Sequence, residues 1–200
     1  MPTIKTVAQA LAATALILPL TACATGADKT GPSTQSSSSG ELSEVMSQNS
    51  LDTMGATEMI DHLDRLGGDK RPTDLMASVR PSEVVLSAGG EEKTLELPDD
   101  KFYLSFAPYV DQTHECFNHS LTTCQGELIS ETVQVEITDT TNDTVLLDDA
   151  VATFENGFIG IWLPRDIEGT IQVTYDGKTG EVDFATTEEA PTCLTTLQMV

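Results

Sequence analysis

The chain has 200 residues and carries 32 acidic against 10 basic side chains, which gives a formal net charge of −22. A surface of this charge repels nucleic acid and anionic lipid headgroups, so neither is an expected partner. The length suits one domain, or one domain with a small accessory region.

Residues 1–22 have the pattern of a bacterial lipoprotein signal peptide. Lys5 supplies a positive start, and residues 7–20 form an apolar run that is short for a membrane span. The run ends in the sequence LTAC at residues 20–23, which resembles a lipobox, where the cysteine is acylated after cleavage. An ordinary signal peptide with a chance cysteine is the alternative, but the combined pattern favours lipidation. We therefore expect Cys23 to anchor an extracytoplasmic protein to the membrane.

The next two segments differ in composition. Residues 23–40 are rich in Ser, Gly and Thr without apolar periodicity, which predicts a flexible tether. Residues 41–98 have mixed signals and predict a small, mainly helical region. The main helix is expected at 57–66, followed by the stop Gly67-Gly68. An earlier turn at 42–46, a short helix at 74–79 and short strands at 82–87 and 93–97 complete the expected elements.

Residues 99–200 change to an alternation of period two, which is typical of half-buried strands. Turn dipeptides at 156–157, 168–169 and 176–177 separate the predicted strands. These strands lie near residues 102–106, 133–137, 144–154, 158–163, 170–175 and 181–185. The predicted fold class is α+β: a small helical N-terminal region followed by a mainly antiparallel β sandwich or open barrel.

The stretch HECFNHSLTTC, residues 114–124, places two histidines and two cysteines in a loop between two predicted strands. Its start resembles the zinc-protease motif H-E-x-x-H, but His119 follows His114 by five residues instead of four. Residues at that spacing diverge by about 140° on a helix, so a zinc protease is excluded. His62 and its acidic neighbours Asp61 and Asp64 are interpreted as a polar helix edge and stay outside the site.

Three cysteines remain if Cys23 is acylated: Cys116, Cys124 and Cys193. Exported cysteines commonly form disulfides, but an odd number leaves one thiol over, and the sequence does not decide which two pair. The spare thiol and the flanking histidines favour a metal site. Thiolate and imidazole ligands suit Cu⁺ and Zn²⁺. The chain lacks the paired C-x₂-C of many structural zinc sites, so Cu⁺ is favoured, with Zn²⁺ as an alternative and the histidines available to Cu²⁺.

Four strings resemble the CueP family of exported copper-binding proteins: YVDQTHECFNHSLTTCQGEL, NGFIGIWLPRD, GTIQVTYDGKTG and APTCLTTL. The resemblance covers about residues 100–197 and, more weakly, 51–86. It implies a copper-resistance protein of the cell envelope with a smaller N-terminal region and a β-rich C-terminal domain. The ligands it implies are Cys116, Cys124 and Cys193, with His114 and His119 nearby. Phe117 departs from the family, because many members have a histidine there.

The resulting hypothesis is a lipid-anchored copper-binding protein that sequesters copper or hands it on, without enzymatic turnover. A disulfide between two of the ligands blocks binding until it is reduced through a mixed disulfide. We therefore expect a thioredoxin-like envelope reductase and a copper-acceptor protein as partners. The alternatives are a thiol-disulfide redox protein of the envelope, and a zinc-binding or purely structural surface module.

Overall fold

A computed structural model describes residues 40–200. The predicted signal peptide, Cys23 and all of the predicted tether except Gly40 lie outside the described residues. Within residues 40–200, none of the helices has the length and apolar character needed to cross a membrane.

Two short α-helices open the described part of the chain: α1 (Glu41–Gln48) and α2 (Ala56–Leu63). A 3₁₀ turn, η1 (Gly68–Lys70), follows. In α2 the buried side chains are Met59, Ile60 and Leu63, which is the apolar stripe that predicted a helix here. The predicted helix is confirmed, although it ends at Leu63, because the Leu66 N–H bonds the Leu63 carbonyl in a tighter turn.

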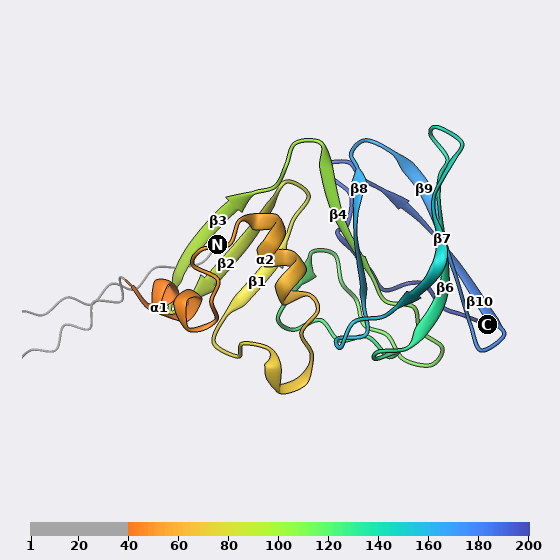
Figure 1. The fold of residues 1–200 in the computed structure, drawn as a ribbon. Helices are drawn as coiled ribbons and strands as arrows, with labels where there is room; N and C mark the ends of the chain where they lie inside the picture. Colours follow the sequence, from red (N-terminus) through yellow and green to blue (C-terminus); the bar gives the residue numbers. More distant parts are fainter. Residues whose placement is uncertain (1–39) are drawn as a thin grey trace, which may run out of the picture. The chain divides into compact units, whose positions relative to one another are not determined.

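The helices share an apolar core with a four-stranded antiparallel sheet of order β3-β2-β1-β5 (Figure 1). Its strands are β1 (Met76–Val79), β2 (Glu83–Ala88), β3 (Glu91–Glu96) and β5 (His119–Ser120). The two strands predicted in this region are confirmed as β2 and β3, but the helix predicted at 74–79 is wrong. Ala77 and Val79 are buried while Met76 is 55% exposed, so this segment alternates as a strand and pairs with β2 and β5.

Two further sheets enclose the second core. One has the order β10-β9-β6-β7, and the other has β11-β4-β8. The strands are β4 (Lys101–Phe106), β6 (Thr132–Asp139), β7 (Thr144–Ala152), β8 (Ile159–Pro164), β9 (Glu168–Tyr175), β10 (Lys178–Ala185) and β11 (Cys193–Leu194). Phe102 and Phe106 of β4 pack in one cluster with Val135 of β6 and Val173 of β9, so the two sheets face each other. The α+β fold class is confirmed.

The turn predicted at Glu168-Gly169 is wrong, because both residues lie inside β9. The chain instead turns at Asp166, whose φ is +59°. Gly169 is required by space: a Cβ there would lie 2.2 Å from the carbonyl oxygen of Thr138 and 2.6 Å from the Phe184 ring. This glycine therefore marks a close strand approach instead of a turn.

The final segment of the chain holds the cysteine–histidine loop against both halves of the fold. β11 pairs in parallel with β4, with Cys193 opposite Ser105. β5 pairs with β1, with His119 opposite Val79. Thr192, next to β11, links the final segment to β1 and β5. Its hydroxyl donates to the Val79 carbonyl at 2.7 Å and accepts the His119 N–H at 2.9 Å. Residues far apart in sequence are thereby brought to one place.

Candidate metal site

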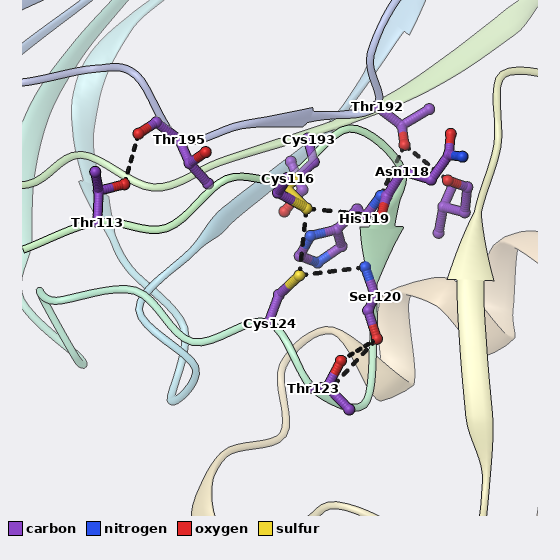
Figure 2. Close-up of a disulfide and its surroundings, with 12 residues drawn as sticks. Thr113, Cys116, Asn118, His119, Ser120, Thr123, Cys124, Thr192, Cys193 and Thr195 are labelled. Atoms are coloured by element: carbon purple, nitrogen blue, oxygen red, sulfur yellow. Dashed lines mark hydrogen bonds between the residues drawn. A yellow bond between two sulfur atoms is a disulfide. The ribbon is translucent and has the colours of Figure 1, made fainter.

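Four of the five predicted metal ligands converge. One ligand atom from each of Cys116, His119, Cys124 and Cys193 lies within 4.8 Å of all the others. Among the cysteines of residues 40–200, Cys116 and Cys193 form a disulfide, and the Cys124 thiol is free (Figure 2). The Cys124 sulfur lies 3.4 Å from that of Cys116. The structure thus settles the pairing that the sequence left open.

The backbone around the cluster is fixed by local hydrogen bonds. The Phe117 carbonyl accepts the N–H groups of Thr192 and Cys193 at 2.9 and 3.1 Å, which ties the loop to the chain's final segment. Cys124 closes a tight turn, because its N–H bonds the Ser120 carbonyl at 3.1 Å. The Ser120 N–H in turn points at the Cys124 sulfur at 3.4 Å. The sulfur positions therefore follow from strand pairing and one turn.

Burial within the cluster is uneven. His119 is fully buried, Cys193 and Cys124 are nearly so, and Cys116 is half-buried. The side chains of Ala107 and Phe158 pack over the sulfurs as an apolar cover. A partner that attacks the disulfide therefore meets the sulfur of Cys116 first.

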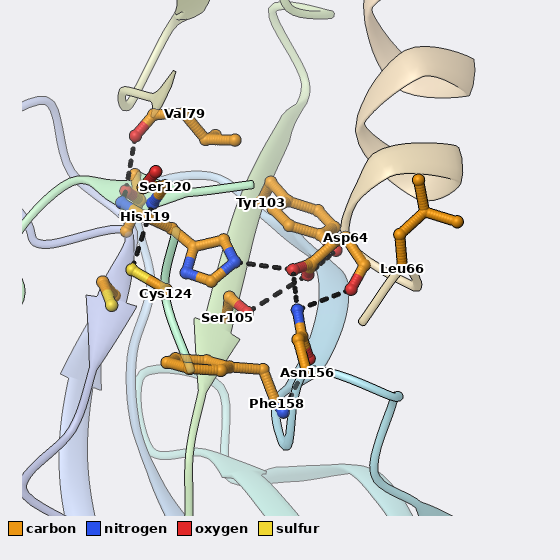
Figure 3. A network of polar contacts seen from close by, with 12 residues as sticks. Asp64, Leu66, Val79, Tyr103, Ser105, His119, Ser120, Cys124, Asn156 and Phe158 are labelled. Carbon is orange, nitrogen blue, oxygen red and sulfur yellow. Dashed lines mark hydrogen bonds and ion pairs between the residues drawn. The ribbon is translucent and has the colours of Figure 1, made fainter. Parts of the chain in front are cut away.

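A buried carboxylate lies behind the histidine. His119 Nε2–H donates to Asp64 Oδ1 at 2.6 Å, and both side chains are 0% exposed (Figure 3). Asn156 Nδ2 donates to the same oxygen at 2.8 Å. Tyr103 and Ser105 donate their hydroxyls to Asp64 Oδ2 at 2.6 and 3.2 Å. Every lone-pair region of the carboxylate is thus engaged, which is what a buried charge requires.

The shifted pKa values follow from this pairing. Burial alone lowers the pKa of His119, but the charge and hydrogen bond of Asp64 outweigh it and raise that pKa to about 9. Burial alone raises the pKa of Asp64, whereas the charge of His119 and the donated hydrogen bonds bring it below its ordinary value. The pair is therefore ionised at neutral pH.

The Cys124 thiol has a lowered pKa for a related reason. Burial raises this pKa, but the neighbouring positively charged His119 ring, the Ser120 N–H and the charge of Arg71 together lower it. A thiol in such surroundings carries more thiolate at neutral pH, and the thiolate is the form that binds metals and attacks disulfides.

The second ring nitrogen of His119 faces the sulfurs. Nδ1 is buried and has no hydrogen-bond partner within residues 40–200, and in Figure 3 it points toward Cys124. With the disulfide reduced, the cluster therefore offers three sulfurs and one nitrogen, which suits a three-coordinate soft ion or a tetrahedral one. With the disulfide formed, only Cys124 and His119 remain available.

The fifth predicted ligand, His114, lies outside this compact group. Its ring centroid is 6.1 Å from that of Phe158, and its Nε2 atom is buried without a hydrogen-bond partner in the part of the chain that the structure describes. His62 lies on α2 and is exposed, apart from the site as predicted. Phe117, where the resemblance led us to expect a histidine in many relatives, is 57% exposed next to Cys116.

Sequence reasoning missed Asp64. The prediction of an exposed polar helix edge is wrong for this residue, because its side chain is fully buried against His119. A signal was present: Asp64 lies four residues after Ile60, on the apolar face of α2. A carboxylate at such a position needs a buried partner. Asn156, predicted only as part of a turn, is also buried, and its Nδ2 donates to both the main-chain oxygen and Oδ1 of Asp64.

Comparison with known proteins gives one matching family and a similar solved structure. The family model described as periplasmic copper-binding protein CueP matches residues 58–198. A solved structure described as the crystal structure of S.CueP is 42% identical, with a TM-score of 0.73. That likeness covers 79% of this chain and 96% of the other. No match is found among curated proteins.

Proposed function

The chain belongs to the CueP family of periplasmic copper-binding proteins, and we propose that it binds copper through the thiolates of Cys116, Cys124 and Cys193 and a nitrogen of His119. The observation that carries the proposal is the convergence of these four ligand atoms within 4.8 Å. They come from a loop, a two-residue strand and the chain's last segment, and a merely structural disulfide needs only two of them. Binding alone is proposed, without catalytic turnover.

Cu⁺ is the preferred ion in this proposal. Soft thiolates match a soft ion, and Cu⁺ is satisfied by two or three of them. Zn²⁺ is the second candidate, because three sulfurs and one imidazole nitrogen make a tetrahedral set that zinc also accepts. The compact arrangement around His119 is the observation that keeps zinc in competition.

Copper loading is gated by the Cys116–Cys193 disulfide in this proposal. Reduction begins when the thiolate of an envelope reductase attacks the sulfur of Cys116, the most exposed of the three. A mixed disulfide forms, Cys193 leaves as thiolate, and a second thiol of the reductase then releases Cys116. A thioredoxin-like protein has this dithiol chemistry, which makes it the proposed partner.

The location proposed for this activity is extracytoplasmic, at the cell surface or on the periplasmic side of a membrane, with Cys23 as the lipid anchor. The LTAC sequence after the apolar run supports it. An anchored protein with a three-thiolate site can sequester copper near the membrane, and a copper-acceptor protein completes the proposed route.

The test is a titration of Cu⁺ against a chelator, with oxidised and reduced samples of one preparation and thiols counted in each. The reduced protein should bind one Cu⁺, and serine at any of the three cysteines should weaken binding strongly. His62→Ala is the matched control and should change nothing. Equal binding by the oxidised protein contradicts the gate, while disulfide exchange without stoichiometric copper binding supports the redox alternative. Tighter binding of Zn²⁺ than of Cu⁺ supports the zinc alternative.

A further inference from the structure

We infer that Asp64 is a positioning residue that presents His119 to the metal through Nδ1 and so gives the site its fourth ligand. The inference rests on the proposed function and concerns one residue that the cysteine–histidine motif does not contain. Asp64 precedes Cys116 by 52 positions and lies at the end of α2, in the N-terminal part of the described chain.

The carboxylate of Asp64 is held in a single orientation. Asn156 fixes it from one side, since its Nδ2 donates to Asp64 Oδ1 at 2.8 Å and to the Asp64 main-chain oxygen at 2.6 Å. Tyr103 and Ser105, both on β4, fix Oδ2. Rotation of the carboxylate would break several buried hydrogen bonds together, so Oδ1 stays aimed at His119.

A fixed Oδ1 determines which imidazole nitrogen can meet a metal. Nε2 donates to Asp64 at 2.6 Å, and Nδ1 is left on the side of the sulfurs, buried and without a hydrogen-bond partner among residues 40–200 (Figure 3). A bound metal takes the place of the proton on Nδ1. Carboxylate–histidine–metal arrangements of this kind fix the tautomer and ring orientation and make the coordinating nitrogen a stronger donor. Asp64 therefore acts on the metal through His119, without touching it.

The contribution of Asp64 depends on the ion. Three thiolates already complete the coordination of Cu⁺, so the nitrogen adds little to its affinity. A divalent ion that prefers tetrahedral coordination needs the nitrogen as its fourth ligand. Loss of Asp64 should accordingly weaken the binding of divalent ions much more than the binding of Cu⁺. It should also change the spectrum of a coordinated probe ion.

The experiment uses the reduced full-length mature protein and Co²⁺, a spectroscopic substitute for a tetrahedral divalent ion. Asp64→Asn and His119→Ala should both change the ligand-field bands of tetrahedral cobalt, because the nitrogen ligand is misplaced or lost while the three thiolates remain. Both should weaken Co²⁺ binding roughly 10–100-fold, with a clearly smaller loss for Cu⁺ in the chelator competition. An unchanged cobalt spectrum and affinity in Asp64→Asn would overturn the inference.

Two control variants separate positioning from general destabilisation. Tyr103→Phe removes a buried hydrogen bond to Oδ2 but leaves the contact between Oδ1 and His119, so it should lower stability and keep the cobalt spectrum. Asp61→Asn changes an exposed carboxylate on the same helix that accepts only the Trp162 indole N–H, and it should bind like wild type. The same change of the spectrum in Tyr103→Phe would also contradict the inference.

A measurement on the wild-type protein covers the case in which Asp64→Asn does not fold. Nitrogen NMR of the histidine rings in the zinc-loaded protein distinguishes a metal-bound Nδ1 from a protonated Nε2. Metal on Nε2, or no metal on the His119 ring, overturns the inference while leaving thiolate binding of copper intact. If the reduced wild type binds neither Cu⁺ nor Co²⁺, the proposed function fails as well.

Discussion

Reduction of the Cys116–Cys193 disulfide should destabilise the copper-free protein by several kcal/mol. The two cysteines are separated by 77 positions in sequence. In the chain-entropy description, cross-linking a loop of this length removes about 15 cal/mol/K from the unfolded chain, which corresponds to about 4.5 kcal/mol at 25 °C. The loop that is closed contains β5 to β10, so most of the β-rich core lies inside it.

Copper should restore this stability, because an ion held by Cys116, Cys124 and Cys193 closes the same loop. Urea unfolding of oxidised, reduced and reduced copper-loaded samples, with thiols counted in each, measures the two changes. Cys124→Ser is the control, since it keeps the disulfide and should lose stability on reduction without full recovery on copper loading. Oxidised and reduced proteins that unfold at the same urea concentration would refute the loop-closure reasoning.

Three other outcomes follow from the sequence and structure. In the oxidised, copper-free protein, the pKa of His119 is raised from 6.5 to about 9. The corresponding contribution of roughly 3 kcal/mol to the free energy of unfolding should be complete below pH 6.5 and lost as the pH rises through about 9. Urea unfolding of wild type and His119→Gln across this pH range checks this. Gly169→Ala should lower the free energy of unfolding by about 2 kcal/mol or more, measured in the same assay, because a Cβ there meets the Thr138 carbonyl. Cys23→Ala should move the protein out of the membrane fraction after cell fractionation, and a variant that stays membrane-bound contradicts lipidation.

Strand prediction worked where the alternation was long and its turn was chemically unambiguous. Buried and more exposed residues alternate along β6, and Asp176-Gly177 supplies the positive φ values, +49° and +78°, that a tight hairpin needs. Predictions for short segments failed, because the conformation of such a segment depends on the strands that it packs against in the fold. Residues 74–79 became a strand through pairing with β2 and β5, and Gly169 serves strand packing instead of a turn.

The ligands of the site could be predicted from the sequence, but the disulfide pairing and the partner of His119 could not. The softness of thiolate ligands and the odd number of cysteines indicated a metal site at Cys116, Cys124 and Cys193. The structure places all three together with His119. The pairing of Cys116 with Cys193 depends on the parallel docking of β11 on β4, which no local pattern reports. Asp64 reaches the site only because the end of α2 lies against β4, where Tyr103 and Ser105 donate to its carboxylate. Its role therefore could be seen only in the fold.

The local charge of the site explains how a strongly acidic protein can keep thiolates available. A net charge of −22 by itself opposes loss of the thiol proton, but charges beyond about 8–10 Å are largely screened at physiological salt. Near Cys124 the nearest charged groups include the His119 imidazolium and the Arg71 guanidinium, and both lower the pKa of the thiol. Arg71 is held beside the site by its Nε–H, which donates to the Leu66 carbonyl at 2.9 Å, and its Nη2 atom is buried without a hydrogen-bond partner among the described residues. Asp64 carries a negative charge too, yet it offsets that effect on Cys124 by keeping His119 protonated and oriented. The acidic surface thus surrounds a small buried region of opposite sign, in which sulfur anions form readily and a soft cation can replace the proton.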